Sequence, residues 1–397
     1  MTGGQGVTFA RGFVAGAVAA GVKHDGTARL DVAVIASTAE HCHAAGVFTT
    51  NHVIAAPCVV TKKHLAGGHL RAIVVNSGNA NACTGPQGER DAVAMASAAG
   101  ELLHLDPHDV AVASTGVIGV PMPMDRIGPA IARIALSGAG WDDASRAIMT
   151  TDTRPKLAQR ELVLSGGAVR IGGMAKGAGM IHPNMATMLA FLTTDALIDS
   201  AALRPMLRSA ADDTFNAISV DGDTSTNDTL LVLANGASGV RVGTLEGPPF
   251  LDALTAVCLD LARAIVADGE GVTKVFEVHV TGAASESDAR LAARTVTTSN
   301  LVKTAIHGAD PNWGRILAAA GRSGAKVDAG RASIRIGGVA VFERGAPRPF
   351  DPAAVRTVFE RPDIEIALDL GFGEGVARAW GTDLSAEYVR INADYTT

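Results

Sequence analysis

The sequence predicts an α+β protein, and three observations support this fold class. The chain has 397 residues, of which 47% are hydrophobic, so it can bury a large core and is long enough for two or three domains. Short runs rich in β-branched residues and longer segments of helical periodicity both occur along it. Charged residues make up only 19%, as expected for a chain with much buried surface or large subunit interfaces.

The expected strands and helices are distributed over the whole chain. Residues 229–234, with the sequence TLLVLA, are typical of the strands, because they form a short and densely apolar run. A helix is expected after Pro86, since proline suits the first helical turn and apolar residues recur at helical spacing up to Leu103. Strands are expected at residues 30–37, 46–50, 56–61, 71–75, 110–113, 187–192, 229–234, 276–280, 333–336, 339–343, 364–370 and 375–380. Further helices are expected at residues 141–149, 201–217, 251–267, 285–307 and 316–320.

Composition and charge exclude several functional classes. The net charge of −6 and the lack of a basic stripe argue against nucleic acid as the main partner. No run approaches the roughly 20 apolar residues that a membrane helix needs. Residues 13–22 resemble the core of a signal peptide, but Gly16 and Gly21 interrupt them and a single positive charge, Arg11, precedes them. We therefore expect a cytoplasmic protein without membrane attachment.

Two polar clusters raise the question of a metal site, and we predict none. In His41-Cys42-His43 neighbouring side chains of a strand would point to opposite faces. Residues 221–228 carry alternating acidic residues, but the glycine and terminal glutamate of a calcium loop are misplaced. The four cysteines show no C-x-x-C spacing and are expected to be reduced thiols.

Residues 172–194 have the most distinctive pattern in the chain. Gly172, Gly173, Gly177 and Gly179 predict a loop where backbone can approach backbone or a ligand, and an apolar strand follows from Thr187. Threonine is common in strands, so Thr187 could simply open this one. Alternatively its hydroxyl is a nucleophile activated by its own α-amine, which requires that the chain first be cut before Thr187.

Polar segments elsewhere are also expected to be loops. Residues 76–81 form an asparagine-rich turn-forming segment, and the strand at residues 110–113 is expected to end in a loop at residues 114–119. Hydroxyls and a glycine N–H at a strand end could donate to a negative oxygen. The last residues of the chain are expected to be frayed.

The segment KGAGMIHPNMATMLAF resembles the self-processing site of the glutamate N-acetyltransferase family, also called ornithine acetyltransferases. Further blocks of the family appear in the expected order along essentially the whole chain: GF-x-A-G-x-x-x-A-G-V-K, NSGNANACTG, STGVIG, TTDT-x-PK, DGEG and YVRINADYTT. The resemblance implies an α-β-β-α layered sandwich and cleavage between Ala186 and Thr187. Residues 1–186 and 187–397 would be two interlocked fragments, assembled as a heterotetramer with two copies of each.

The resemblance also implies roles for individual residues. Thr187 would be the nucleophile, and Thr115 and Gly116 would form the oxyanion hole. The substrate-binding residues would be Thr153, Lys176, Thr187, Glu270, Asn392 and Thr397.

The implied reaction transfers acetyl from N2-acetylornithine to glutamate in the cyclic arginine pathway. No cofactor is expected, and the sequence leaves open whether acetyl-CoA is also a donor. Two alternatives remain open: an amidase or aminopeptidase that uses the same nucleophile, and a non-enzymatic module that binds amino acids.

Overall fold

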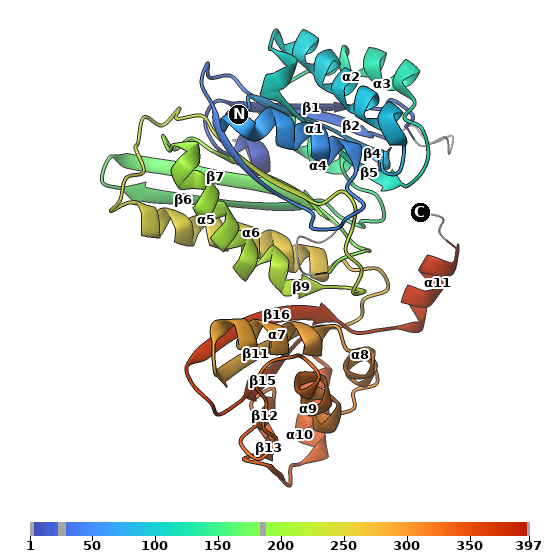
Figure 1. The fold of residues 1–397 in the computed structure, drawn as a ribbon, viewed down its shortest axis with the longest axis vertical. Helices are drawn as coiled ribbons and strands as arrows, with labels where there is room; N and C mark the ends of the chain where they lie inside the picture. Colours follow the sequence, from blue (N-terminus) through green and yellow to red (C-terminus); the bar gives the residue numbers. More distant parts are fainter. Residues whose placement is uncertain (1–3, 23–28, 183–187, 395–397) are drawn as a thin grey trace.

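The structure is a computed structural model that describes residues 4–22, 29–182 and 188–394. Within these residues the strands form three sheets of four, five and seven strands. Figure 1 shows that helices lie above and below the two smaller sheets, and that the largest sheet and its helices form a separate C-terminal unit.

The four-stranded sheet has the order β1-β2-β4-β5 and is built from the first third of the chain. Its strands are β1 (Phe13–Val18), β2 (Val32–Ser37), β4 (Ala72–Asn79) and β5 (Val110–Val117). The helices nearby are α1 (Ala56–His64), α2 (Gly85–Leu103), α3 (Met124–Ile131) and α4 (Trp141–Ala147).

The five-stranded sheet has the order β3-β10-β8-β7-β6. Its strands are β3 (His43–Phe48), β6 (Lys156–Leu164), β7 (Gly167–Lys176), β8 (Leu189–Thr194) and β10 (Thr229–Ala234). Two long helices cover it, α5 (Ser200–Asp213) and α6 (Gly247–Val266). Strand β8 lies in the middle, antiparallel to β7 and parallel to β10.

Alternation along the strands builds the layers of the sandwich. Ile35 of β2 and Phe191 of β8 belong to one core cluster between the sheets. Their neighbours point the other way: Val34 packs with α2 residues, and Leu192 packs with residues of α5 and α6. Since successive side chains of a strand face opposite sides, strands buried on both faces read as unbroken apolar runs. The predicted α+β class and the α-β-β-α sandwich are confirmed.

The C-terminal unit is a seven-stranded sheet of order β14-β13-β12-β15-β11-β16-β9. It comprises β11 (Val275–Ala283), β12 (Ser333–Ile336), β13 (Val339–Glu343), β14 (Ala346–Pro347), β15 (Asp363–Asp369) and β16 (Gly375–Thr382). Its helices are α7 (Glu286–Thr297), α8 (Asn300–His307), α9 (Trp313–Gly321) and α10 (Pro352–Phe359). Strand β9 (Ile218–Ser219) follows α5 and pairs with β16, so it joins this unit to the sandwich.

One predicted strand was wrong. Residues 56–61 lie in helix α1, although Val59, Val60 and Thr61 are β-branched. Pro57 occupies the first helical turn, where its fixed φ favours a helix and its missing N–H has no cost.

Three predicted loops were also wrong in part. Strand β4 continues through Asn79, β5 continues through Val117, and Gly172 and Gly173 lie within β7. Gly172 and Gly173 lie where β7 is crowded by neighbouring chain, which explains why both residues are glycine. A Cβ on Gly172 would come 1.9 Å from the Gly6 carbonyl oxygen, because the segment at Gly6 crosses this strand.

The last residues of the chain were predicted to be frayed. As far as Asp394 this was wrong, because they form helix α11 (Ala386–Asp394). Strands β1, β6, β9 and β14 and helices α3 and α10 were not predicted. Ala186, Thr187 and Thr397 lie outside the described residues. No helix in the described ranges is long and apolar enough to cross a membrane.

Candidate active site

A cavity of about 150 Å³ lies where β5, β7 and helix α11 meet. Thr115 and Gly116 come from β5, Lys176 ends β7, Glu270 follows α6, and Asn392 lies on α11. The other lining residues are Ala80, Ile118, Thr150, Thr151, Gly179, Met180, Asp221, Asp223, Ser225, Thr226, Asn227 and Tyr388. Segments far apart in the sequence therefore present hydroxyls, one ammonium and several carboxylates to one space.

The end of β5 is shaped by a glycine in a conformation that other residues rarely adopt. Gly116 has φ +136°, and a Cβ there would come 2.3 Å from the carbonyl carbon of Gly78 on β4. The pairing of the two strands shifts register at Gly78 and Asn79. The close contact thus depends on glycine at position 116.

Gly116→Ala is expected to destabilise the protein by about 1–3 kcal/mol and to impair turnover, because both the φ angle and the contact with Gly78 are lost. Gly119→Ala is the matched control: its φ is +81°, but nothing lies within 4 Å of a Cβ there. Thermal unfolding and turnover of both variants measure the difference. Equal effects would show that the contact with Gly78 is unimportant.

Lys176 is a buried cation at the end of β7. Its ammonium donates to the Thr115 hydroxyl at 3.2 Å and to the Thr150 hydroxyl at 2.7 Å. Burial lowers its pKa, and the nearby Asp152 carboxylate opposes that shift. Because an ammonium can only donate, the Thr115 hydroxyl accepts from Lys176 and keeps its own proton for another acceptor.

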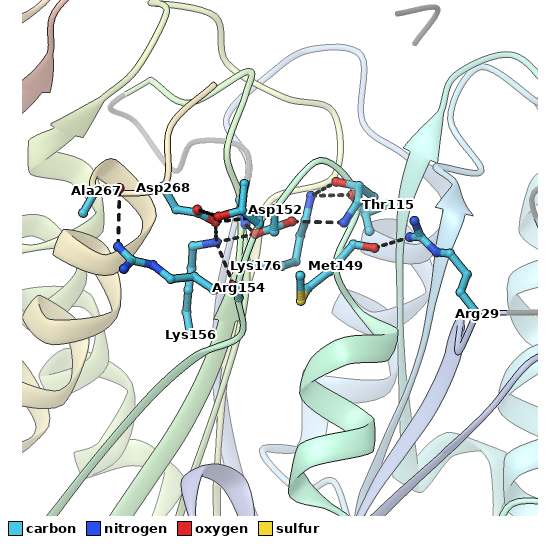
Figure 2. Close-up of polar contacts among 12 residues, drawn as sticks. Arg29, Thr115, Met149, Asp152, Arg154, Lys156, Lys176, Ala267 and Asp268 are labelled. Atoms are coloured by element: carbon cyan, nitrogen blue, oxygen red, sulfur yellow. Dashed lines mark hydrogen bonds and ion pairs between the residues drawn. The ribbon is translucent and has the colours of Figure 1, made fainter. Parts of the chain in front are cut away.

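Behind Lys176 lies a buried network of charges, which Figure 2 shows. The Lys156 ammonium lies 2.6 Å from both the Asp152 and Asp268 carboxylates, and the Gly177 N–H donates to Asp152 at 2.7 Å. Burial favours the neutral form of Asp152, but the charges of Lys176 and Lys156 outweigh it and lower its pKa to about 2. The network holds the turn that follows Lys176.

On the other side of the cavity, Glu270 is held by the backbone and by α11. Its N–H donates to the Ala178 carbonyl at 2.9 Å, and its carboxylate accepts from the Asn392 amide at 2.9 Å. A Cβ on Gly179 would come within 2.6 Å of all three atoms of this carboxylate group. Gly179 therefore allows Glu270 to lie against the backbone of the loop.

Two aspartates, Asp221 partly buried and Asp228 buried, hold the described chain on either side of residues 183–187. The Asp221 carboxylate accepts from the N–H groups of Met180 at 2.5 Å and Ile181 at 2.9 Å. Asp228 accepts from the Met188 N–H at 2.9 Å. Burial raises the pKa of Asp221 to about 6 and raises that of Asp228 well above its usual range. Carboxyl groups thus anchor the backbone at Met180, Ile181 and Met188.

Five of the residues singled out from the sequence line the cavity: Thr115, Gly116, Lys176, Glu270 and Asn392. Thr153 does not line it; its N–H donates to Asp268 at 3.0 Å and its hydroxyl also bonds Asp268. The roles of these five residues and of Thr153 stay predictions, as do those of Ala186, Thr187 and Thr397. Sequence reasoning missed Asp152, Lys156 and Asp268; their only local signals are the block TTDT-x-PK, which contains the first two, and the block DGEG, which begins at Asp268.

The described residues include no group of three or more histidine, cysteine, aspartate or glutamate side chains arranged for a metal ion. Cys42, Cys58 and Cys258 are buried and unpaired, and Cys83 is exposed. Burial raises the pKa of Cys42 to about 12 and that of Cys58 to about 11, so neither is a thiolate near neutral pH.

Comparison with known proteins adds independent information. A family model described as ArgJ family matches residues 14–397. The arginine biosynthesis bifunctional protein ArgJ of Symbiobacterium thermophilum is 54% identical, over 99% of this chain and 98% of its own length. The crystal structure of ArgJ from Bacillus halodurans is 43% identical and has a TM-score of 0.51, covering 52% of this chain and 98% of that chain. That of ornithine acetyltransferase from Mycobacterium tuberculosis, complexed with ornithine, is 43% identical with a TM-score of 0.43, covering 47% and 96%.

Proposed function

We propose a course of reaction from the premise that this chain belongs to the ArgJ family. As a member it is an acyltransferase of arginine biosynthesis that acts on small amino-acid substrates. The proposed reaction transfers acetyl from N2-acetylornithine to glutamate, giving ornithine and N-acetylglutamate.

The transfer passes through an acetyl ester of Thr187. The α-amine of Thr187 takes the hydroxyl proton as the oxygen attacks the acetyl carbonyl, and the tetrahedral intermediate collapses as the ornithine nitrogen takes up that proton and leaves. The amine of glutamate then attacks the ester and regenerates Thr187. An α-amine has a pKa of about 7.7–8.0, which suits a general base near neutral pH.

The observation that carries this proposal is the opposite charge on the two sides of the cavity. Ornithine and glutamate share an α-amino-acid head group and differ in the charge of the side chain. Lys176 offers a cation for a carboxylate, while Glu270 and Asp223 offer anions for an ammonium group. One cavity can therefore hold both substrates in turn.

The Thr187 α-amine exists only after the Ala186–Thr187 bond has been cut. In that step the Thr187 hydroxyl attacks the Ala186 carbonyl, an ester replaces the amide, and water releases the new N-terminus. The coverage of the Bacillus halodurans structure supports this: 98% of that solved chain corresponds to 52% of this one. Residues 187–397 are 211 of 397, or about 53%.

Two measurements test the proposed function. Intact mass should show two fragments, beginning at Met1 and Thr187; a single uncut species in an active preparation contradicts the mechanism. The cut protein is then incubated with N2-acetylornithine with and without glutamate. N-acetylglutamate should form only with glutamate, whereas release of acetate irrespective of glutamate would identify a hydrolase.

Thr115→Val is expected to lower kcat by about 10²–10³, because the free proton of its hydroxyl is proposed to bond the oxyanion of the intermediate. Thr115→Ser, which keeps the hydroxyl, should retain most of the activity. Steady-state kinetics on both variants give the result. An unchanged kcat for Thr115→Val would remove Thr115 from the oxyanion hole.

Three broader properties are part of the same proposal. Acetyl-CoA acetylates the same Thr187, in keeping with the word bifunctional in the name of the relatives; the formation of N-acetylglutamate from acetyl-CoA measures this. The fragments assemble as a heterotetramer, two of each, whose mass light scattering would give. The enzyme works in the cytoplasm, which cell fractionation would show.

A further inference from the structure

A second cavity, of about 670 Å³, lies where the sandwich meets the C-terminal unit. Helices α5 and α6 and the turn after α5 form one wall, and α7 and β16 form the other; Figure 1 shows these elements at the junction. Its lining residues are Asp212, Asp213, Thr214, Asn216, Ala217, Thr255, Leu259, Arg290, Arg294, Val376, Ala377, Arg378 and Trp380. None of them lines the candidate active site.

Two of the three arginines in this cavity already have carboxylate partners. Arg290 lies 2.7 Å from the Asp213 carboxylate and donates to the Asp212 carbonyl at 3.0 Å. Arg378 lies 3.4 Å from Glu277, which is outside the cavity. The fold therefore accounts for the charges of both.

Arg294 is different, because no described residue lies within hydrogen-bond or ion-pair distance of its guanidinium. It is half-buried and one helical turn from Arg290; burial and the charge of Arg290 lower its pKa, and the charge of the Asp212 carboxylate opposes that shift. A guanidinium stays charged nonetheless, and a partly buried charge that forms no direct ion pair has a free-energy cost, which the charge of Asp212 offsets only in part. Since folding does not require this arrangement, it indicates a site for an anion.

The wall around Arg294 is apolar and rigid. Trp380 is 5% exposed, and its indole N–H donates to Glu277 at 3.0 Å, which fixes the ring. Leu259, Val376 and Ala377 extend this surface. An apolar surface beside a charged group without a direct partner is a combination that small-molecule pockets use.

A carboxylate in the lining of the cavity favours a ligand that carries a single negative charge. Asp212 also lines the cavity, and its carboxylate accepts from the Asn216 amide at 2.8 Å. A polyanion would bring further negative charge close to this carboxylate, which opposes binding. We propose that the cavity binds a small organic monoanion, whose charged group pairs with Arg294 and whose flat apolar part packs on Trp380 and Leu259.

The test uses 8-anilinonaphthalene-1-sulfonate, a fluorescent aromatic monoanion, on the full protein. Arg294→Gln should weaken its binding by about tenfold, which corresponds to about 1.4 kcal/mol. Arg208→Gln is the matched control, because Arg208 is exposed on the neighbouring helix α5 and lines no part of the cavity. It should leave the Kd unchanged.

Two further arms locate and classify the site. Trp380→Phe should reduce energy transfer from tryptophan to the bound probe. The energy transfer that remains in this variant comes from the other two tryptophans and gives the background. Benzoate should displace the probe and inorganic pyrophosphate should not. An equal Kd for wild type and Arg294→Gln, or displacement by pyrophosphate as effective as by benzoate, overturns the proposal. Should Arg294→Gln fail to fold, Arg294→Lys must still weaken binding severalfold, because lysine lacks the planar fork. Binding is measured without substrate, so the result is independent of the proposed acetyl transfer.

Discussion

Thr187→Ala leaves the chain uncut and abolishes acetyl transfer; this is the largest effect that we expect from any single substitution. Without the hydroxyl neither the Ala186 carbonyl nor the acetyl carbonyl meets a nucleophile. Loss of the nucleophile in an acyl-enzyme mechanism lowers kcat by on the order of 10⁶. Intact mass and a coupled assay for N-acetylglutamate measure both effects in one preparation.

Thr187→Ser is the matched control, since serine keeps the hydroxyl and would have an α-amine after cleavage. It should retain part of both cleavage and turnover. A Thr187→Ala protein that is uncut yet turns over acetylornithine at the wild-type rate would refute the mechanism. Thermal unfolding of each variant shows whether the fold is retained.

Asp152→Asn is expected to destabilise the protein by about 3 kcal/mol and to impair substrate binding. Asp152 is buried between Lys156 and Lys176, and removing one partner from a buried ion pair leaves a charge uncompensated. An uncharged amide oxygen is also a weaker acceptor for the Gly177 N–H, which should disturb the loop that carries Gly179 and Met180. Urea unfolding gives the change in stability, and the KM for acetylornithine reports on the site.

The exposed pair of Asp142 and Arg146 provides the control. Asp142→Asn also removes a carboxylate from an ion pair, but water screens that pair, so stability should change very little. An Asp152→Asn variant as stable as Asp142→Asn would show that the buried network does not stabilise the fold.

Acid unfolding should show the same network. The pKa of Asp152 is about 2 in the folded protein, whereas an aspartate in an unfolded chain has a pKa of 3.8. Its contribution to the free energy of unfolding is therefore nearly complete above about pH 4. It is lost as the pH falls toward 2 and amounts to about 2 kcal/mol. In Asp152→Asn this part of the acid sensitivity should be missing from a series of unfolding midpoints between pH 2 and 6.

The elements that were predicted correctly have strong local signals. Residues 229–234 form a strand because the run is apolar on both faces, and α2 begins where Pro86 indicated. The segment at residues 56–61 has β-branched residues but packs as a helix, since tertiary contacts outweigh a weak preference for strands. Asn76 and Ser77 continue β4 because neighbouring strands β2 and β5 pair with them.

Residues of the candidate site that lie in distinctive sequence blocks were predicted, but the contacts between distant segments were not. Thr115, Gly116 and Lys176 were identified by resemblance, and only the fold shows that they share one cavity. Asp268 contacts Lys156 across 112 positions of sequence, and no local pattern marks such a pair. Asp221 and Asp228 were assigned to a polar loop, and only their burial beside Met180 and Met188 shows that they hold the chain.

The strand order of the five-stranded sheet has a consequence for the proposed cleavage between Ala186 and Thr187. Strands β3, β7 and β6 precede position 187 and strands β10 and β8 follow it, and the two groups interleave as β3-β10-β8-β7-β6. Either fragment made alone would expose unpaired strand edges, which promote aggregation. We therefore expect the chain to fold as one polypeptide before the proposed cut, and fragments synthesised from two genes should give active enzyme only if they assemble during folding.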